Sequence, residues 1–568
     1  MGCGNPRLAT DDAVASPQTN ERGRPAAPPQ AIFAAWQNSG VDFVHRADAA
    51  EQYFMPRTIG SGAAVFDYNG DGLLDLYLIQ NAGPESEHKN RLYRLRDDHR
   101  FTDVSAGSGL DAAGFGMGAA AGDFNNDGRV DLLVTEYGRV RLFRNRTAGD
   151  QPAFEDVTAA AGVENPFWGT SAAYFDFDRD GWLDFVIVNY VNYDPARWCA
   201  DGSSRQEFCG PDAFPGRMAK LYRNLGPQPD DQIRFEDVTV NSGLAAAPGP
   251  GLGIYCADFD GDRWPDMFVA NDGQPNHLWI NQRDGHFVEE GVARGVAYNA
   301  MGKAEANMGV AVGDVDGDSL FDLFVTHLTE ETHTLWRQEP RGYFLDRTAA
   351  SKLIGVSARS TGFGTAMADV ENDGDLDLIL VNGRVTRAAK APGGSSSRVD
   401  EFWLPYAEPN QLLLNKGDGH FENASGANPD LCGGVGVSRG LAVADFDDDG
   451  GLDLVVTRVG QAPGLYRNVH SGRGHWLTVR AFDPQLKRDA YGAEVTLRAG
   501  EKSTTRIAQS GYSFLCSNDP RCHFGLGEAS RYDAIEIVWP DGGAETFPGG
   551  EADHIVTLER GAGQMLEP

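Results

Sequence analysis

Residues 67–75 of the chain read DYNGDGLLD, and the apolar run LYLI follows directly. Each copy of this loop has oxygen-bearing side chains at positions 1, 3, 5 and 9, and position 7 is free to offer a backbone carbonyl. Seven copies with one spacing indicate a repeated structural unit built around the loop. The six later copies begin at Asp123, Asp176, Asp258, Asp314, Asp369 and Asp445.

The oxygen positions of the loops are typical of a site for a hard cation. Calcium takes about six to eight oxygen ligands and tolerates irregular geometry, so alternating carboxylates suit it better than magnesium or zinc. Glycine at position 6 allows a positive φ, but Arg263 and Ser319 replace it in two copies, so those two loops are expected to be strained or differently wound. We expect several calcium ions, up to seven. The predicted ligands, loop by loop, are Asp67, Asn69, Asp71, Leu73 and Asp75; Asp123, Asn125, Asp127, Arg129 and Asp131; Asp176, Asp178, Asp180, Trp182 and Asp184; Asp258, Asp260, Asp262, Trp264 and Asp266; Asp314, Asp316, Asp318, Leu320 and Asp322; Asp369, Glu371, Asp373, Asp375 and Asp377; Asp445, Asp447, Asp449, Gly451 and Asp453.

Two other structures use similar residues, the EF-hand and the plain hairpin turn. An EF-hand begins in a similar way, but it needs a bidentate Glu at position 12 and flanking helices, whereas position 12 is apolar here. Asp, Asn and Gly can also form plain hairpin turns. Crowding carboxylates without a cation is costly, which favours the metal. The runs after position 9 are short and rich in β-formers, so each is expected to be a buried strand.

The charge and length of the chain set limits on its class. The 568 residues carry a formal net charge of -33, and the acidic loops hold much of it, so nucleic acid or an anionic membrane is a poor partner. No stretch approaches the roughly 20 apolar residues of a transmembrane helix. A chain of this length is expected to hold two domains unless repeats spread its core.

The first 30 residues are expected to form a separate tether. Residues 5–30 are polar and rich in Pro and Ala, which is the composition of a disordered segment. The first four residues resemble the end of a bacterial lipobox, with Cys3 as the lipidated residue, although no apolar segment precedes it. A lipid anchor at Cys3 and an incidental cysteine in a tail therefore both stay open.

The spacing of the loops predicts a repeat of about four strands. Successive first aspartates lie 53 to 56 residues apart, except for two intervals of 82 and 76 residues. A Gly-rich apolar segment precedes each loop, as at residues 60–66, and strand-like segments such as residues 90–93 and 101–104 follow it. The order strand, acidic hairpin, strand, loop, strand, turn, strand predicts blades of four strands each.

These repeats resemble the FG-GAP, or VCBS, repeats of integrin α-chain propellers. The resemblance implies an all-β fold with a seven-bladed β-propeller over residues 31–468, in which residues 40–45 supply the strand that closes the ring. It also implies that the calcium is structural and lies on the bottom face, between the first and second strands of each blade. The opposite, top face is then the expected place for a ligand.

After residue 468 the repeat stops and short alternating strands begin. Residues 488–493, 523–527 and 538–542 resemble the ASPIC/UnbV domain, which implies a small β-sandwich-like domain over residues 469–568. The two domains together resemble the cartilage acidic protein 1-like family. This resemblance implies a calcium-stabilised recognition or adhesion protein that is exported to the cell envelope or the extracellular space.

Two functional hypotheses follow. The first is a monomeric protein that binds a protein or carbohydrate on the top face; the second is a calcium-dependent enzyme of the hydrolase, lyase or cyclase type, with a small-molecule substrate in a central pocket of that face. The second strands end there in polar residues, of which Glu136, His327 and Arg458 are the candidate catalytic groups. A ligand rim and ordinary solvation of strand ends explain this polarity equally well. The seven strand-end residues are Gln80, Glu136, Asn189, Asn271, His327, Asn382 and Arg458.

Two long insertions, residues 190–217 and 384–409, follow the same strand ends and should stand on the top face, where they are expected to set specificity. His327 and His333 flank two glutamates, which could form a second metal site or an acid and base pair.

Cysteine spacing predicts disulfides Cys199–Cys209 and Cys516–Cys522 in an exported protein, while Cys256 is expected to be a buried thiol and the pairing of Cys432 stays open.

Overall fold

The computed structural model describes residues 30–47, 53–229, 232–355, 360–388 and 399–566. The described chain is all-β, with repeated sheets of four strands and only single-turn helices. The expected tether and Cys3 lie outside the described residues. The helical turns are α1 (Pro56–Ile59), α2 (Gly291–Arg294), α3 (Pro429–Cys432), η2 (Pro211–Ala213), η3 (Leu244–Ala246), η4 (Leu404–Tyr406) and η5 (Ser425–Ala427).

Seven antiparallel sheets follow one another along the described part of residues 33–468. The first holds β2 (Ala63–Phe66), β3 (Asp75–Leu78), β4 (Arg91–Leu95) and β5 (Phe101–Asp103); the second β6 (Gly116–Gly122), β7 (Asp131–Glu136), β8 (Arg139–Asn145) and β9 (Phe154–Asp156); the third β10 (Gly169–Phe175), β11 (Asp184–Asn189), β12 (Lys220–Pro227) and β13 (Ile233–Asp237); the fourth β14 (Gly251–Ala257), β15 (Asp266–Asn271), β16 (His277–Asn281) and β17 (Phe287–Glu289). The fifth holds β18 (Val310–Gly313), β19 (Asp322–Val325), β20 (Thr334–Gln338) and β21 (Phe344–Asp346); the sixth β22 (Gly362–Ala368), β23 (Asp377–Asn382), β24 (Gln411–Asn415) and β25 (Phe421–Asn423); the seventh β26 (Ser438–Ala444), β27 (Asp453–Arg458), β28 (Gly464–Asn468) and β1 (Phe33–Ala35).

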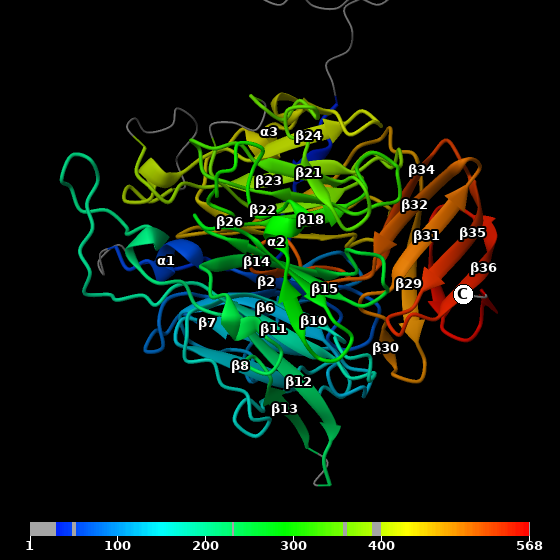
Figure 1. Ribbon diagram of the computed structural model, residues 1–568, viewed down its shortest axis with the longest axis horizontal. Helices are drawn as coiled ribbons and strands as arrows, with labels where there is room; N and C mark the ends of the chain where they lie inside the picture. The colour runs from blue at the N-terminus through cyan, green and yellow to red at the C-terminus, as the bar shows by residue number, and fades with distance from the viewer. Residues whose placement is uncertain (1–29, 48–52, 230–231, 356–359, 389–398, 567–568) are drawn as a thin grey trace, which may run out of the picture.

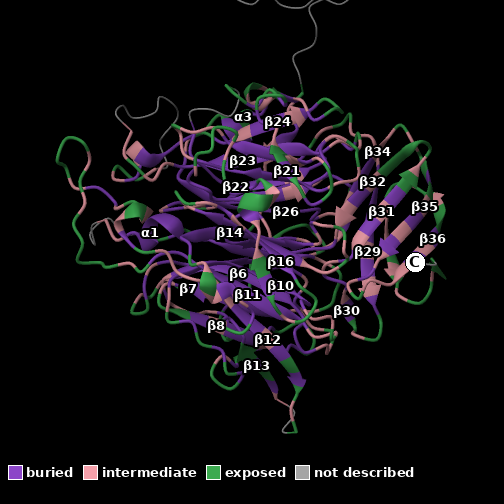
Figure 2. Ribbon diagram, in the orientation of Figure 1, coloured by how far each residue is buried: buried purple, intermediate pink, exposed green. Residues whose placement is uncertain are grey.

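Each acidic loop connects the first and second strands of its sheet. In the second sheet, for example, Gly122 of β6 stands opposite Asp131 of β7, and the loop lies between them. The first strands are almost entirely buried, and Figure 2 shows the buried interior of the repeat region. The first strands carry Gly and Ala because they lie closest to one another, where larger side chains would collide.

The strand expected at residues 40–45 is not formed, so that expectation is wrong. The outer strand of the seventh sheet is instead β1, whose Phe33 stands opposite Asn468 of β28. Gly40 has a φ of +91° and turns the chain after β1. Phe43 then packs between Val65 of the first sheet and Ala442 of the seventh, as a hydrophobic side chain rather than as part of a sheet.

Hydrophobic clusters join consecutive sheets throughout the repeat region. One such cluster joins Leu133 of the second sheet to Ile187 of the third, and another joins Val65 of the first sheet to Val455 of the seventh. The first strands of consecutive sheets are in contact, and β26 is also in contact with β2. The core is therefore divided among interfaces between sheets rather than gathered in one centre.

The C-terminal unit, residues 475–565, packs two sheets face to face. Its core contains Leu477 and Phe524 from one sheet and Val495, Ile535 and Ile537 from the other. Figure 1 shows this unit and α1 on opposite sides of the repeat region. The first sheet holds β29 (His475–Asp483), β30 (Arg488–Asp489), β34 (Cys522–Gly527) and β37 (His554–Glu559), and the second β31 (Glu494–Ala499), β32 (Lys502–Ile507), β35 (Arg531–Val538), β36 (Ala544–Glu551) and β38 (Gln564–Met565).

One segment of the C-terminal unit reaches the first strands of all seven sheets. This central segment, residues 509–518, includes β33 (Cys516–Ser517), which pairs in parallel with β2. Phe514 and Leu515 pack against Met55 and Ile59, which lie within or just before α1. Its other contacts with the sheets are Leu515 O with Ala119 N, Leu515 N with Ser171 Oγ, Gln509 Nε2 with Cys256 O, Ser513 N with Val310 O, Ser513 Oγ with Thr365 N, and Asn518 Oδ1 with Val443 N.

Candidate metal loops and the opposite face

The first aspartate of each loop is held by the backbone of its own loop. Asp176 accepts hydrogen bonds from the N–H groups of Asp180 (3.1 Å) and Gly181 (2.9 Å). The two loops without glycine at position 6 adopt the same left-handed backbone, since φ is +70° at Arg263 and +66° at Ser319. They are therefore wound like the others, and the non-glycine residue costs about 1 kcal/mol of strain.

The ninth-position aspartate ties each loop to the third strand of its sheet. Asp184 accepts hydrogen bonds from the N–H of Phe177 (3.0 Å) in the loop and from that of Asn224 (2.7 Å) in β12. Burial raises the pKa of Asp184 well above its ordinary value, and the charge of Asp176 raises it further. The same arrangement recurs at Asp131. Position 9 is therefore part of the sheet as well as a predicted metal ligand.

Carboxylate oxygens converge in four of the loops, where they could hold a metal ion. In each group three oxygens from different residues lie within 4.8 Å of one another. The groups are Asp176, Asp178 and Asp184; Asp258, Asp260 and Asp262; Asp314, Asp316 and Asp322; Asp445, Asp447 and Asp449. Such a cluster of like charges is the arrangement that a divalent cation stabilises.

Orphan oxygens at position 3 give an independent test of whether a cation fits. The Oδ1 atoms of Asn125, Asp178, Asp316 and Asp447 are buried and have no hydrogen-bond partner among the described residues. A buried oxygen without a donor costs about 1–3 kcal/mol, and a bound cation would remove that cost. The residues of these loops therefore fit calcium, which prefers oxygen ligands.

The pKa values of the first aspartates show how far the loops depend on a counter-charge. Burial raises the pKa of Asp123 to about 6, and the neighbouring carboxylate of Asp127 adds to the shift. Burial likewise raises the pKa of Asp369 to about 7, with a contribution from Asp373. Without a cation, Asp123 would take up a proton below about pH 6 and Asp369 below about pH 7.

A third-strand arginine beside the loops was missed in the sequence. Arg94 contacts Asp71 at 2.8 Å, Arg223 contacts Asp178 at 2.6 Å, and Arg337 pairs with Asp316. The signal was present, because Leu, an aromatic residue and Arg follow one another at residues 92–94, 142–144, 221–223, 335–337 and 465–467. The fourth and sixth sheets carry Ile280 and Leu414 at this place.

The C-terminal unit lies against the loops through buried arginines. Arg488 donates from Nε to Asn126 Oδ1 at 2.9 Å and from Nη2 to the carbonyl of Gly181 at 3.2 Å, so it bridges the second and third loops. Arg521 donates from Nη1 to Asp448 Oδ1 at 3.3 Å in the seventh loop. The face that carries the acidic loops is thus partly covered by this unit.

The candidate catalytic residues lie at or just beyond the second-strand ends of three different sheets. Glu136 is buried and accepts hydrogen bonds from Arg139 (2.5 Å) and Arg141 (2.6 Å). His327 is fully buried, and burial lowers its pKa to about 3. Arg458 is half-buried and donates to the hydroxyl of Tyr466 at 2.5 Å. No hydrogen bond or ion pair joins these three within the described ranges, and their catalytic role stays a prediction.

The side chains of other strand-end residues are hydrogen-bonded to nearby loops. The Gln80 side chain accepts from the N–H of Arg46 and donates to the carbonyl of Val44, and the Asn382 amide donates to the carbonyl of Pro409. The predicted His327 and His333 cluster is also internal, because the N–H of His327 donates to Nδ1 of His333 at 2.8 Å. These polar side chains at the strand ends therefore form hydrogen bonds with backbone groups of loops, and they do not face solvent.

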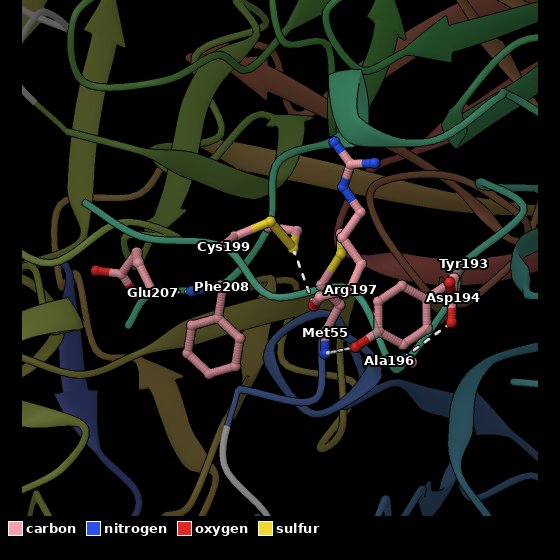
Figure 3. The surroundings of a disulfide bond; sticks show 9 residues. Met55, Tyr193, Asp194, Ala196, Arg197, Cys199, Glu207 and Phe208 are labelled. Atoms are coloured by element: carbon pink, nitrogen blue, oxygen red, sulfur yellow. Dashed lines mark hydrogen bonds between the residues drawn. A yellow bond between two sulfur atoms is a disulfide. The ribbon is translucent and has the colours of Figure 1, made fainter. Parts of the chain in front are cut away.

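The two insertions meet each other on the side away from the acidic loops. The Glu207 carboxylate accepts from the hydroxyl of Tyr406 at 2.5 Å and from the N–H of Arg387 at 3.0 Å. Phe208 stacks on Trp403, with ring centroids 5.9 Å apart. Figure 3 shows Glu207 and Phe208 next to the disulfide.

The cysteines follow the prediction only in part. Cys199 and Cys209 form a disulfide, and Cys256 is a buried free thiol, as predicted. The predicted Cys516–Cys522 disulfide is wrong, since both are buried free thiols, and so is Cys432. Cys516 belongs to β33, which pairs with the first sheet of the repeat region, whereas Cys522 pairs with Val479 in the C-terminal unit. Two separate sheets therefore hold these thiols.

Comparison with known protein families assigns the chain. The FG-GAP-like repeat model matches residues 67–134, 123–187, 258–325, 314–380 and 397–456, and the ASPIC and UnbV model matches residues 483–565. The chain belongs to the family of FG-GAP-like repeat proteins and carries a C-terminal ASPIC and UnbV domain. The resemblance predicted from the sequence is thereby confirmed.

Among curated proteins the chain is similar to cartilage acidic protein 1. It is 26% identical to the Xenopus tropicalis protein over 511 residues, which is 86% of this chain and 71% of that protein. It is also 26% identical to the Homo sapiens protein over 513 residues, which is 86% of this chain and 70% of that protein.

A solved structure concerning recognition of non-reducing terminal N-acetylglucosamine by an Agrocybe aegerita protein shares 15% identity and a TM-score of 0.39, and covers 78% of this chain and 100% of that chain. A likeness at this TM-score carries no argument. Within its described residues the chain has no helix that is both long and apolar enough to cross a membrane.

Proposed function

We propose that this protein is a calcium-stabilised recognition or adhesion protein, in which calcium in the acidic loops is structural and the opposite face binds a protein or carbohydrate. The observation that carries the proposal is the set of orphan position-3 oxygens beside converging carboxylates. Asp178, Asp316 and Asp447 each belong to both sets. A calcium ion would provide a partner for the unpaired oxygens and would reduce the repulsion between the carboxylates. These residues would supply its oxygen ligands.

The scaffold proposed for this function is a closed seven-bladed propeller over residues 31–468, followed by a domain over residues 469–568. Support for closure comes from β1, which completes the seventh sheet, and from the contact of β26 with β2. Closure would leave few exposed sheet edges. The disulfide Cys199–Cys209 supports an extracellular or envelope location, because such bonds persist in oxidising compartments.

The proposed binding face is the one formed by the two insertions. Trp198, next to the disulfide, is 62% exposed, which is unusual for an aromatic side chain of this size in a folded protein. Exposed aromatic residues are common anchors for protein and sugar ligands. The enzyme alternative needs a pocket at the centre of this face. Phe514 and Leu515 pack against α1 at that place, so their side chains occupy the space and favour recognition over catalysis. We propose that the protein acts as a monomer.

A binding screen tests the proposed function. Proteins and glycans are screened in calcium and in chelator, using the full chain and the W198A variant. We expect a ligand bound by the calcium-loaded protein and weakened at least tenfold in W198A, because an aromatic anchor contributes about 2 kcal/mol or more. The matched control is Y343A, an exposed aromatic on another loop, which should keep wild-type affinity. Equal affinity in calcium and chelator would contradict the proposal.

A further inference from the structure

A cavity of about 100 Å³ lies between the repeat region and the C-terminal unit. The ends of β18, β22 and β26 line one side of it, where these strands enter their acidic loops, and β32, β34 and the central segment line the other. Because one water needs about 10–15 Å³ by this measure, the cavity has room for a small ion together with some water. Its contents therefore depend on the polar groups in its wall.

Arg506 is half-buried and brings a positive charge to the wall of this cavity. Its Nη1 donates to the carbonyl of Thr505 at 3.1 Å, whereas its Nη2 is buried with no hydrogen-bond partner in the described part of the chain. Burial lowers the pKa of Arg506, and Asp369 and Asp314 oppose the shift from a distance. A buried N–H donor without an acceptor costs about 1–3 kcal/mol, so Nη2 favours an acceptor inside the cavity.

Two carboxylates in the wall, Asp369 and Asp445, are already engaged in their own loops. Asp369 accepts hydrogen bonds from the N–H groups of Asp373 (3.1 Å) and Gly374 (2.8 Å) in its own loop, and it is a first-position ligand in the proposed calcium site. Once divalent cations occupy the sixth and seventh loops, Asp369 and Asp445 serve as metal ligands and not as counter-ions of Arg506. The other arginine in the wall, Arg521, is neutralised by Asp519 at 2.8 Å.

Two further polar groups in the wall show what the cavity can hold. Thr478 Oγ1 is buried with no partner within the described residues, so its hydroxyl can donate a hydrogen bond into the cavity. His523 donates from Nε2 to the carbonyl of Gly450 at 3.1 Å, so its Nδ1 is an acceptor and suits water rather than an anion. The wall thus offers one unpaired positive charge, one free donor and one water site.

We propose that this cavity binds one small monovalent anion such as chloride, held by the Arg506 guanidinium and the Thr478 hydroxyl. The anion lies at the junction of the repeat region and the C-terminal unit, and so it stabilises their docking. A single unpaired positive charge matches a single negative charge, and the available volume suits a monatomic ion. The inference rests on the proposed calcium sites, because calcium removes Asp369 as the counter-ion.

Anomalous diffraction tests the site directly. The full chain is purified and crystallised with calcium and with sodium bromide in place of sodium chloride, and data are collected at the bromine edge and at a long wavelength for calcium. We expect a bromine peak within hydrogen-bond distance of Arg506 Nη2 and calcium peaks in the acidic loops. Calcium peaks with only water in the cavity overturn the anion site and leave the proposed function standing, whereas missing calcium peaks overturn the calcium part of that function.

Melting in solution tests the residues. The melting temperature is followed as sodium chloride replaces sodium gluconate at constant ionic strength and saturating calcium. We expect a saturable rise, with the chloride midpoint raised about tenfold or more in R506Q, because a hydrogen bond to a charged group is worth about one to two factors of ten. T478V should raise it less and serves if R506Q does not fold. The control R498Q, whose side chain pairs with Glu536 at 2.7 Å, should match wild type. A wild-type protein that is insensitive to chloride, or an R506Q variant that keeps the wild-type midpoint, overturns the proposal.

Discussion

The face that carries the acidic loops and the face opposite to it are built by different means. On the first, the same loop recurs once per sheet, and each first aspartate is held by its own backbone, as at Asp176. On the second, two unequal insertions are joined by Glu207 with Tyr406 and by Phe208 with Trp403. The acidic loops of the first face can be predicted from the periodic sequence. The other face depends on contacts between segments that lie far apart in the chain, which the sequence does not predict.

Removal of calcium should lower the stability of the protein more than any other change. A protein of unchanged stability would contradict the difference drawn between the two faces. We expect an excess of chelator to lower the free energy of unfolding by on the order of 10 kcal/mol, because several sites each contribute about 2–4 kcal/mol when well loaded. The measurement is the denaturation midpoint in calcium and in chelator. A matched midpoint in the two buffers would mean that the acidic loops need no cation and that the two faces do not differ in this way.

The next effect concerns the segment that connects the two faces. Phe514 is fully buried among the first strands, beside Met308 and Phe363, so F514A should cost about 3–5 kcal/mol. The same substitution at the half-buried Phe402 of the second insertion should cost less, because part of its surface already meets solvent. Denaturant titration of both variants measures the difference. A smaller loss in F514A than in F402A would show that the central segment contributes little to the fold.

The sequence predicted the repeated face well and the central segment not at all. The loop spacing predicted strands that begin at the ninth-position aspartates. β7 begins at Asp131 and β11 at Asp184, as expected. The central segment has no periodicity, and Cys516 was predicted to pair with Cys522 because only five residues lie between them in the sequence. A strand that pairs with the first sheet of another unit leaves no local pattern, so only the folded chain reveals it.

The insertions were predicted in place but not in detail. Their length and position indicated a common face, and the disulfide Cys199–Cys209 was predicted from spacing. The partner of Glu207 could not be predicted, because Tyr406 lies 199 residues further along the chain. The same holds for the closing strand, where residues 40–45 resembled a strand but β1 is the segment that reaches β28.

The dependence of stability on pH sharpens the comparison of the two faces. Calcium should change the pH dependence that arises from the acidic loops, and it should leave that of the opposite face unchanged. Burial raises the pKa of Asp123 to about 6 and that of Asp445 to about 7, so both bind protons more tightly folded than unfolded. Without calcium, their contribution is fully present below about pH 4 and is lost as pH rises through 6 to 7.

We therefore expect the chelated protein to gain on the order of 2 kcal/mol on acidification from pH 8 to pH 5.5. With saturating calcium the slope should be flat or opposite, because protons and calcium compete for the same carboxylates. Melting curves over this range in both buffers measure it. Parallel slopes in calcium and chelator would show that these aspartates do not exchange a proton for the ion.

The smallest effect distinguishes sheets within the loop face. Arg337 of β20 pairs with Asp316 of the fifth loop, whereas the sixth sheet carries Leu414 at the same place. R337Q should lower the free energy of unfolding in calcium by no more than about 1 kcal/mol, since partly exposed ion pairs contribute little. It should weaken calcium at one site, because the arginine orients a ligand carboxylate. Calorimetric titration should show one weakened site against a wild-type background, and the control L414M should show none. If R337Q bound calcium more tightly, the arginine would be a competitor for Asp316 rather than its support, and the sixth loop, whose sheet has Leu414 in its place, would be the stronger site. The fourth loop would not be, because Arg294 contacts its Asp260 at 3.2 Å.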